Sequence, residues 1–442
     1  MRPAERRSGI ILTSNFPCPV QTTDLPGLPM TLRSLLLLSF VTTSLFAAEP
    51  EWNQFRGGRG DGTSKAEGIP TAWSETKNVR WKTEIWGKGW SSPVTWKDRI
   101  WLTTATEDGH RLAVMCLDRK TGKILHDKTI FEHEKPQYCH PFNSYASPTP
   151  WIEDGRLYIT FGALGTACLD SETLRVIWKR EDLECNHWRG PGSSVSIYGN
   201  LLYLPFDGHD HQFVMAFDKR NGKTVWRKDR NVDYKSDNGD IKKAYGTARV
   251  ITFKGRTQVI VPGAMATMAY EPNSGKELWR VIHGGMNACI PPLFSDGKLF
   301  ITTSSPSKLL AVRPDGIGDV TKTHVEWTAR TGVPARPSQL LVGDSMFMVD
   351  NSGVASCIDT ATGKPRWTKR IAGKFTASPV LVGDRIYCFQ REMGKSHVFA
   401  ADPKKYRELA TNTLDAGCMA SPAVTNGLLI LRTKTHLYGI GE

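Results

Sequence analysis

One short motif recurs along the chain and constrains its fold more than any other feature. In the copy at residues 357–367, an apolar run ends at Asp359, a polar turn contains Gly363, and Trp367 lies eight residues after the acid. Other copies repeat this eight-residue step, from Asp170 to Trp178, Asp218 to Trp226 and Glu271 to Trp279. Three looser copies end in His126, Ala410 and, after an insertion, Trp327. Seven copies in one chain indicate a repeat protein.

A second pattern marks the start of each repeat: a small or proline-containing step, a strand, and a turn rich in Gly, Asp or Asn. Its copies lie between 40 and 55 residues apart, at 91–93, 146–148, 193–195, 246–248, 290–292, 337–339, 377–379 and 420–422. Each unit then contains two strands joined by a hairpin, the strand that ends at the acid, and the Trp strand. Four antiparallel strands at this period form a propeller blade, so eight starts predict eight blades.

The two ends of the chain each hold part of a repeat. The last copy stops at 437–442, before its Trp strand, whereas the segment 78–85 holds only a Trp strand, around Trp81. We expect this first strand to complete the eighth blade, because closure removes exposed sheet edges. The predicted fold is therefore all-β: an eight-bladed β-propeller of four-stranded antiparallel blades, closed by an N-terminal strand. Helix should be scarce, since no long segment has the 3.6-residue periodicity of a major helix.

The chain is interpreted as an upstream extension and signal peptide at 1–48, a strap at 49–77 and the propeller at 78–442. The apolar stretch at 35–46 is too short to span a bilayer, and small residues follow it. We expect export to the periplasm or cell envelope, with translation starting at Met30. Leu45 and Phe46 stand where a cleavage site favours small residues, so an uncleaved anchor remains the alternative.

The sequence carries a formal net charge of +13. This charge can favour an acidic envelope surface or an anionic polymer, although a basic surface that only keeps the protein soluble explains it as well. No Lys- and Arg-rich block with interleaved aromatic residues predicts nucleic-acid binding. We expect a monomer whose partner is a protein or an envelope polysaccharide.

The tryptophans of the motif are expected to hold neighbouring blades together. A Trp on an outer strand can lie flat on the next blade and bury most of its ~150–250 Å² side chain, which at ~25 cal/mol per Å² contributes a few kcal/mol. The glycine before it permits a tight turn and a close approach, and the acid accepts hydrogen bonds from the turn. The residues assigned to this structural role are Trp81, Trp178, Trp226, Trp279, Trp327 and Trp367.

A ring of residues around one mouth of the channel is the candidate ligand site. The innermost strand of each blade starts at the channel, and counting two residues back from the Ser, or its equivalent, in the middle of each repeat start yields Trp90, Tyr145, Gly192, Tyr245, Cys289, Arg336, Thr376 and Met419. Three aromatic rings and one Arg could hold a planar, anionic or sugar-like ligand by stacking and charge. Trp90, Tyr145, Tyr245 and Arg336 are therefore the candidate ligand-binding residues. The alternative is that these aromatics only plug the mouth.

Two loops that enter consecutive blades hold Cys and His residues. Cys139 and His140 lie in the first loop, and Cys185 and His187 lie in the second, so the two pairs could meet at one mouth. Two Cys and two His could bind Zn²⁺ tetrahedrally. In an exported protein the two Cys could instead form a disulfide or remain free thiols.

The motif Ala/Cys-x-Asp-x-x-Thr-Gly-x-x-x-Trp resembles the tryptophan-docking repeat of the pyrroloquinoline quinone (PQQ) repeat family of eight-bladed propellers. The resemblance covers about residues 78–442, and the opening at 52–57 also resembles exported PQQ-like propellers of planctomycete-type bacteria. It implies an eight-bladed fold. Members of the family include periplasmic quinoprotein dehydrogenases and a non-enzymatic scaffold lipoprotein of outer-membrane β-barrel assembly.

Resemblance to the dehydrogenases would imply PQQ beside a disulfide between adjacent cysteines, Ca²⁺ held by carboxylate and amide oxygens, and an Asp base. None of the nine cysteines is adjacent to another, and no C-x-x-C-H haem site is present. No catalytic, cofactor-binding or metal-binding residue is therefore assigned. The predicted function is an exported, non-catalytic binding or scaffolding module. A PQQ-dependent alcohol or sugar dehydrogenase with a divergent site is the alternative.

Overall fold

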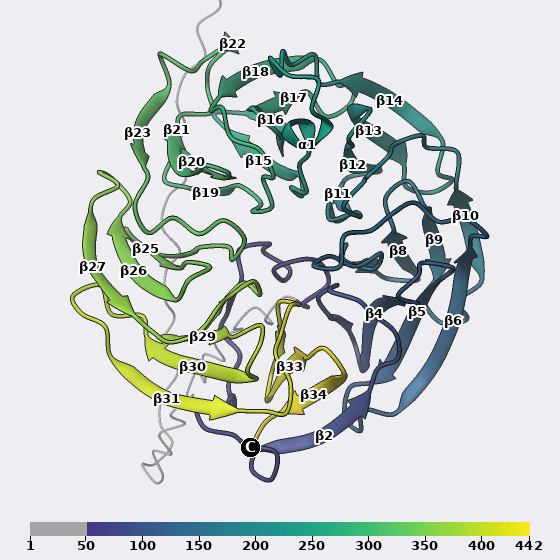
Figure 1. Ribbon diagram of the computed structural model, residues 1–442, viewed down its shortest axis with the longest axis vertical. Coiled ribbons are helices and arrows are strands. Elements are labelled where there is room, and N and C mark those ends of the chain that lie inside the picture. Colours follow the sequence, from purple (N-terminus) through teal and green to yellow (C-terminus); the bar gives the residue numbers. More distant parts are fainter. Residues whose placement is uncertain (1–50) are drawn as a thin grey trace, which may run out of the picture. The chain divides into compact units, whose positions relative to one another are not determined.

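A computed structural model describes residues 51–442, which form a ring of eight β-sheets around a central channel (Figure 1). The all-β, eight-bladed fold predicted from the repeats is confirmed, and α1 (Gly239–Lys242) is the one helix in this part of the chain. None of the described residues forms a helix with the length and apolar character that crossing a membrane requires. The predicted signal segment and the start at Met30 lie outside the described residues.

Each blade contains four antiparallel strands that follow one another from the channel outward. Blades 1 to 4 are β3 (Val94–Trp96), β4 (Arg99–Ala105), β5 (Arg111–Asp118), β6 (Ile124–Glu132); β7 (Trp151–Glu153), β8 (Arg156–Thr160), β9 (Thr166–Asp170), β10 (Val176–Arg180); β11 (Ser196–Tyr198), β12 (Leu201–Asp207), β13 (Gln212–Asp218), β14 (Thr224–Asp229); and β15 (Arg249–Phe253), β16 (Arg256–Pro262), β17 (Ala266–Tyr270), β18 (Glu277–Ile282). Blades 5 to 8 are β19 (Leu293–Ser295), β20 (Lys298–Ser304), β21 (Ser307–Val312), β23 (Val325–Ala329); β24 (Leu340–Val342), β25 (Ser345–Val349), β26 (Val354–Asp359), β27 (Pro365–Arg370); β28 (Val380–Val382), β29 (Arg385–Phe389), β30 (Lys395–Ala400), β31 (Glu408–Thr413); and β32 (Ala423–Thr425), β33 (Leu428–Arg432), β34 (His436–Ile440), β2 (Val79–Glu84). The middle strands are buried, and the cores lie between neighbouring blades.

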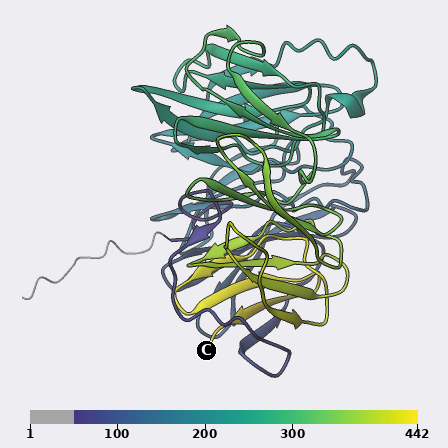
Figure 2. The same cartoon turned by 90° about the vertical axis from the view of Figure 1, so that its left-hand side faces the viewer.

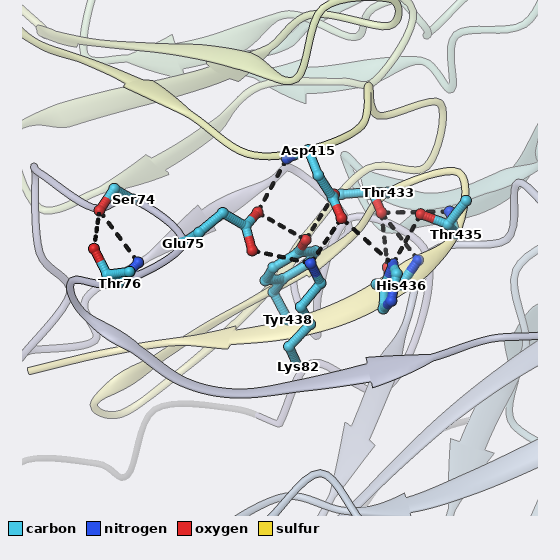
Figure 3. A network of polar contacts seen from close by, with 9 residues as sticks. All are labelled: Ser74, Glu75, Thr76, Lys82, Asp415, Thr433, Thr435, His436 and Tyr438. Atoms are coloured by element: carbon cyan, nitrogen blue, oxygen red, sulfur yellow. Dashed lines mark hydrogen bonds and ion pairs between the residues drawn. The ribbon is translucent and has the colours of Figure 1, made fainter.

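The eighth blade combines strands from both ends of the described chain, because β2 pairs antiparallel with β34. A polar network joins these strands to the segment before β2 (Figure 3). The ammonium of Lys82 lies 3.0 Å from a carboxylate oxygen of Glu75 and 2.7 Å from one of Asp415. The hydroxyl of Tyr438 lies within hydrogen-bond distance of both carboxylates, 2.9 Å from an oxygen of Glu75 and 2.7 Å from one of Asp415. Hydrogen bonds thus hold the closing strand along its outer face.

The tryptophan of one blade lies on the turn of the next blade. The indole N–H groups of Trp81, Trp178, Trp226, Trp327 and Trp367 donate to the carbonyl oxygens of Arg119, Lys219, Pro272, Thr360 and Asp402, respectively. A Cβ on Gly122 would lie 2.5 Å from the Trp81 ring, and Gly222, Gly275 and Gly363 similarly face Trp178, Trp226 and Trp327. The glycine of each motif therefore makes room for the Trp of the preceding blade. Where blade 1 has His126 instead of Trp, the next turn has Leu174 at the glycine position.

Trp279 makes a different contact, and the insertion in the following repeat explains it. Residues 313–324 replace the regular turn of blade 5, and β22 (Gly318–Asp319) pairs with β18 as a fifth strand of blade 4. The Trp279 indole donates to Oε1 of Gln258, 2.6 Å away. The Gln258 amide donates in turn to the carbonyl of Pro314 in blade 5. Gln258 thus connects Trp279 to blade 5 through two hydrogen bonds.

The strap begins inside the ring and then runs outward to the outermost strands of blades 7 and 8 (purple in Figure 1). The carbonyls of Trp52, Asn53 and Gly62 accept hydrogen bonds from the middle residues of three innermost strands, Thr95, Ile152 and Leu381. Short strand β1 (Thr63–Ser64) pairs parallel with β28 and gives blade 7 a fifth strand. Figure 2 shows β1 and α1 toward opposite faces of the ring. The strap therefore covers the inner edges of blades 1, 2 and 7, on the side away from the loops that carry α1.

Candidate functional site

The channel opens at the loop face into a cavity of about 480 Å³, called the funnel below. Every blade supplies one residue to its rim, four residues before the start of the innermost strand: Trp90, Ser147, Gly192, Tyr245, Cys289, Arg336, Thr376 and Met419. Phe55 of the strap lines the funnel as well. Because the strap bonds to the innermost strands beyond these rim residues, Phe55 lies on the inner side of the funnel.

A belt of hydroxyl groups forms the wall below the rim and explains the Ser and Thr of the repeat starts. The backbone N–H groups of Ser92, Thr149, Ser194, Ser338 and Ser378 donate to the side-chain hydroxyls of Thr149, Ser194, Thr247, Ser378 and Ser421 in the next blade. Each hydroxyl satisfies a buried amide of its neighbour. Blade 5 interrupts the belt, since Pro291 has neither a hydroxyl nor an N–H.

The belt corrects the predicted position of Tyr145. In blade 2 it is Thr149, and not Ser147, that accepts from Ser92. Thr149 lies four residues before the end of β7, as Ser92 does before the end of β3. The start of this blade therefore lies two residues later than predicted, because Ala-Ser-Pro at 146–148 matches the other copies better than the true start does. The rim residue of blade 2 is Ser147.

Tyr145 is turned away from the funnel and is only 7 % exposed. Its hydroxyl donates to the carbonyl of Gln137, 2.6 Å away, and its ring packs on Gly109. It lines a smaller neighbouring cavity of about 170 Å³. Of the four candidate ligand-binding residues, Trp90, Tyr245 and Arg336 line the funnel, and Tyr145 supports the loop that leads to it.

The funnel is lined by positive charge and by no carboxylate. Its lining includes Arg189 and Arg336 but neither Asp nor Glu. Arg189 forms a two-point ion pair with Asp240, at 2.9 and 2.5 Å. Arg336 is exposed and has no carboxylate partner among the described residues. Its guanidinium lies 4.7 Å from the ring centroid of Phe142, so this cation remains available to an anion.

Phe142 links opposite sides of the mouth. It belongs to the loop between blades 1 and 2, yet Arg336 before blade 6 and Arg391 in blade 7 both lie against its ring. The indole N–H of Trp90 donates to its carbonyl, 3.2 Å away. The loop thus reaches across the funnel and places an aromatic ring between two arginines, an arrangement that cation–π attraction favours.

Tyr245 lies beside a buried cation. The ammonium of Lys243 is 4.9 Å from the centroid of the Tyr245 ring and donates to the carbonyl of Asp207. Burial lowers the pKa of Lys243 to about 8, because the charged form loses its hydration. The aromatic wall of the funnel is therefore backed by a lysine whose charge responds to mildly alkaline pH.

The residues of the funnel do not fit the centre that a quinoprotein dehydrogenase would need. Calcium requires hard oxygen ligands, usually several carboxylates. The funnel offers no carboxylate, and the side-chain amide of Asn143 donates to the backbone of Arg189 and Pro191. Among the described residues, no three His, Cys, Asp or Glu side chains are grouped to hold a metal ion, and all eight cysteines are free thiols. We therefore derive no catalytic step through a quinone.

The two Cys-His loops lie side by side but do not build a zinc site. The amide of Gln137 donates to the carbonyl of Cys185, which joins the loops. His187 is buried, and its Nε2 accepts from the backbone N–H of Ala163. Burial lowers its pKa well below the usual range and raises the pKa of the Cys185 thiol to about 12. These loops therefore bring no three His, Cys, Asp or Glu side chains together among the described residues, and Cys139 and Cys185 are free thiols.

The sequence analysis missed Phe55, Phe142 and Arg189, which line the funnel from the strap and from two loops. These residues occupy no repeat position, so the spacing of the motif carries no signal for them. Their composition could have drawn attention, since aromatic and Arg side chains in entering loops are typical of binding surfaces.

Comparisons with known proteins agree with the repeat. A family model described as outer membrane protein assembly factor BamB matches residues 210–316 and 321–409. BamB from Moraxella catarrhalis superposes with a TM-score of 0.58 at 13 % identity, covering 82 % of this chain and 99 % of that chain. A quinohemoprotein alcohol dehydrogenase from Comamonas testosteroni gives 0.61 at 9 %, covering 89 % and 80 %. The computationally designed Ika8 protein gives 0.54 at 11 %, covering 84 % and 100 %.

No curated protein matches the sequence of this chain. The identities of 13 % and less to the solved structures show a shared fold and nothing finer. The family model, the eight four-stranded blades and the Trp-docking repeat agree with one another. Together they show an eight-bladed β-propeller that is similar to the PQQ-like β-propellers, with the family model matching less than half of the chain.

Proposed function

We propose that this propeller is an exported, non-catalytic binding or scaffolding module that holds a protein partner or an envelope ligand at the funnel. One observation carries the proposal. The funnel combines aromatic faces and an unpaired arginine with a lining that has no carboxylate to serve as a base or to hold calcium. Such a lining can recognise a ligand, but it lacks the groups that quinone-dependent chemistry needs.

The family comparison supports a scaffold without deciding it. The matching model is described as an outer membrane protein assembly factor, whereas a dehydrogenase shares the fold equally well. Fold likeness therefore does not separate the two functions, and the choice rests on the side chains of the funnel. Export rests on the apolar stretch at 35–46, as expected from the sequence.

The chemistry of the lining suggests what the ligand presents. Arg336 offers an unpaired guanidinium, and Trp90 and Tyr245 offer aromatic faces. Sugar rings carrying carboxylates would satisfy both, by stacking and by charge-assisted hydrogen bonds. An anionic envelope polysaccharide is therefore the ligand that we would test first.

The test uses the full chain and oligogalacturonate as an anionic sugar probe, with neutral dextran as its comparison, in isothermal titration calorimetry. Arg336→Gln removes a cation, and Trp90→Leu removes a stacking ring. Each variant should weaken oligogalacturonate binding about ten-fold. Arg175→Gln changes an exposed arginine in the β9–β10 turn, away from the funnel, and should leave affinity unchanged.

Equal binding of the neutral and anionic sugars, or unchanged affinity in both funnel variants, would contradict the proposal. The enzymatic alternative is tested separately by adding PQQ and Ca²⁺ and following dye reduction with alcohols or sugars. Turnover that Arg336→Gln abolishes would replace the scaffold by the dehydrogenase.

A further inference from the structure

A second concave surface opens beside the funnel, over blades 2 and 3. This groove has a volume of about 640 Å³, and its lining contains four carboxylates and no Lys or Arg. The groove is lined by Gln137, Tyr138, Ala163, Glu181, Asp182, Leu183, Glu184, Cys185, Asn186, Trp188 and Asp210. The acidic lining of this groove differs from the protein as a whole, whose net charge is +13.

Exposed aromatic rings form one side of the groove. Tyr138 is 51 % exposed and Trp188 is 42 % exposed, although large aromatic side chains are usually buried. Their ring centroids lie 5.2 Å apart, and His209 follows 5.6 Å from Trp188. The backbone of Trp188 has a φ of 52°, in the left-handed region that a bulky residue rarely adopts. The fold thus holds this indole outward at a conformational cost.

Two of the four carboxylates remain without a basic partner. Glu181 and Asp182 pair with Lys179 and Arg180, each at 2.6 Å. Glu184 forms no ion pair within the described chain. Asp210 is held by backbone donors.

Asp210 accepts hydrogen bonds from the backbone N–H groups of Asn186 and His211, at 2.8 and 2.7 Å. The His211 imidazole lies 4.0 Å away and is charged only when protonated. Glu184 and Asp210 therefore form no ion pair with a Lys or Arg side chain among the described residues, and they leave the groove acidic.

Hydrogen bonds fix the rims of the groove before any ligand arrives. The side-chain oxygen of Asn186 accepts from the backbone N–H of Trp188, and its carbonyl accepts from the N–H of His209. Gln137 donates to the carbonyl of Cys185 and accepts from the N–H of His187. A surface that is already ordered loses little conformational entropy on binding.

We propose that this groove binds a positively charged peptide segment of a partner protein, with an Arg or Lys side chain on the faces of Tyr138 and Trp188. Glu184 and Asp210 then face the cation. Guanidinium and ammonium groups bind aromatic faces, and nearby carboxylates add charge attraction that steers the partner. This site is separate from the funnel and does not depend on the ligand proposed there.

The test measures binding of an acetylated and amidated octapeptide of alternating Arg and Gly to the full chain by fluorescence anisotropy. The matched peptide of alternating Glu and Gly and a neutral cello-oligosaccharide are the comparison ligands. We expect only the Arg peptide to bind, and we expect its affinity to fall at least three-fold between 50 and 300 mM salt, because salt screens charge attraction.

Three groove variants should each weaken the Arg peptide about five- to ten-fold: Trp188→Asn, Tyr138→Ala and Glu184→Gln. Asn is chosen because it tolerates the backbone of Trp188. Tyr198→Ala and Glu67→Gln, which change an exposed aromatic and an exposed acid outside the groove, should leave affinity unchanged. A thermal melt checks that each variant is folded.

Failure of the Arg peptide to bind, or unchanged affinity in Tyr138→Ala and Glu184→Gln, would overturn the proposal. Binding of the neutral oligosaccharide in its place would also overturn it, since the groove would then be a sugar site. None of these outcomes bears on the funnel, whose probe and variants are different.

Discussion

The funnel and the groove open from the same loops but present opposite charge. Both expose aromatic rings, yet the funnel is lined by two arginines without a carboxylate, and the groove by four carboxylates without a basic residue. The net charge of +13 therefore predicts neither surface. Charge in such a ring is decided locally, by the loops that enter each blade, and the two sites can select different partners.

The two sites also rest on different supports. All eight blades supply the rim of the funnel, whereas loops around blades 2 and 3 build the groove. The contact between two neighbouring blades is called a seam here. Weakening one seam of the ring should consequently affect ligand binding at the two sites unequally. The tryptophans of the repeat offer matched changes at different seams, so they give the strongest test of this comparison.

The largest effect is expected when Trp81 or Trp178 is replaced by Ala. Each indole is 8 % exposed, packs on a glycine and donates to a carbonyl of the next blade. Loss of such a buried ring should lower the free energy of unfolding by about 3 kcal/mol or more, measured by chemical denaturation. Trp178→Ala loosens the seam below the groove and should weaken the Arg peptide several-fold. Trp81→Ala loosens the closing seam and should leave the groove within two-fold of wild type.

Equal loss of peptide affinity in both variants would contradict the idea of separate supports. Oligogalacturonate binding tests the funnel in the same variants, because the rim of the funnel adjoins the contact between blades 8 and 1. Trp81→Ala should therefore weaken oligogalacturonate binding, and the melting temperature reports the loss of stability in both proteins.

An intermediate effect is expected from Lys243, which lies between the two sites. Its ammonium faces Tyr245 of the funnel and is attracted by the carboxylate of Asp210 in the groove. Burial lowers its pKa to about 8, below the value near 10.4 of an unfolded chain. Between these values the unfolded state binds more protons, so this residue's contribution to stability rises with pH.

The free energy of unfolding of the wild type should therefore gain about 2 to 3 kcal/mol relative to Lys243→Met between pH 8 and 10. Denaturant titrations of both proteins at several pH values measure this difference in unfolding free energy. Groups that titrate in both proteins cancel in the difference. Lys242→Met, the neighbouring change on α1, should show no such slope. A flat difference for Lys243→Met would mean that the native pKa of this lysine is not lowered, so that its ammonium stays charged in the folded protein up to the pH where an unfolded chain titrates.

The smallest effect is expected from Gln137→Ala, which removes the bridge between the loops of the two sites. The carbonyl of Cys185 and the N–H of His187 lose their partner. One unsatisfied buried pair costs about 1 to 3 kcal/mol of stability. Peptide affinity at the groove should fall about three-fold in anisotropy, while the funnel probe changes less than two-fold. Equal weakening at both sites would show that they share this support.

Most of the fold could be predicted from the repeat, because its signals are local. An acid, a glycine turn and a Trp recur at fixed spacing, and each blade makes the same contact with the next. The register of blade 2 could not be predicted, since Ser147 and Thr149 both match the start pattern. Only the hydrogen bond from Ser92 to Thr149 distinguishes them, and it joins residues 57 positions apart.

The candidate site was predicted in part. The rim positions of Trp90, Tyr245 and Arg336 follow from the repeat, and these residues line the funnel. Phe142 follows from no repeat, because its loop crosses the mouth to reach arginines of distant blades. Contacts of this kind depend on how a closed ring brings loops together.

The sequence by itself determined the number of blades, their four strands and the tryptophans between them, because these are repeated contacts between neighbours in the chain. Only the tertiary structure decided that the glycine of each motif serves the preceding blade's Trp. It also decided that Tyr145 leaves the rim and that one face carries sites of opposite charge. The physical reason is that closure places side chains from all blades around one channel, where distant loops set the local charge and shape.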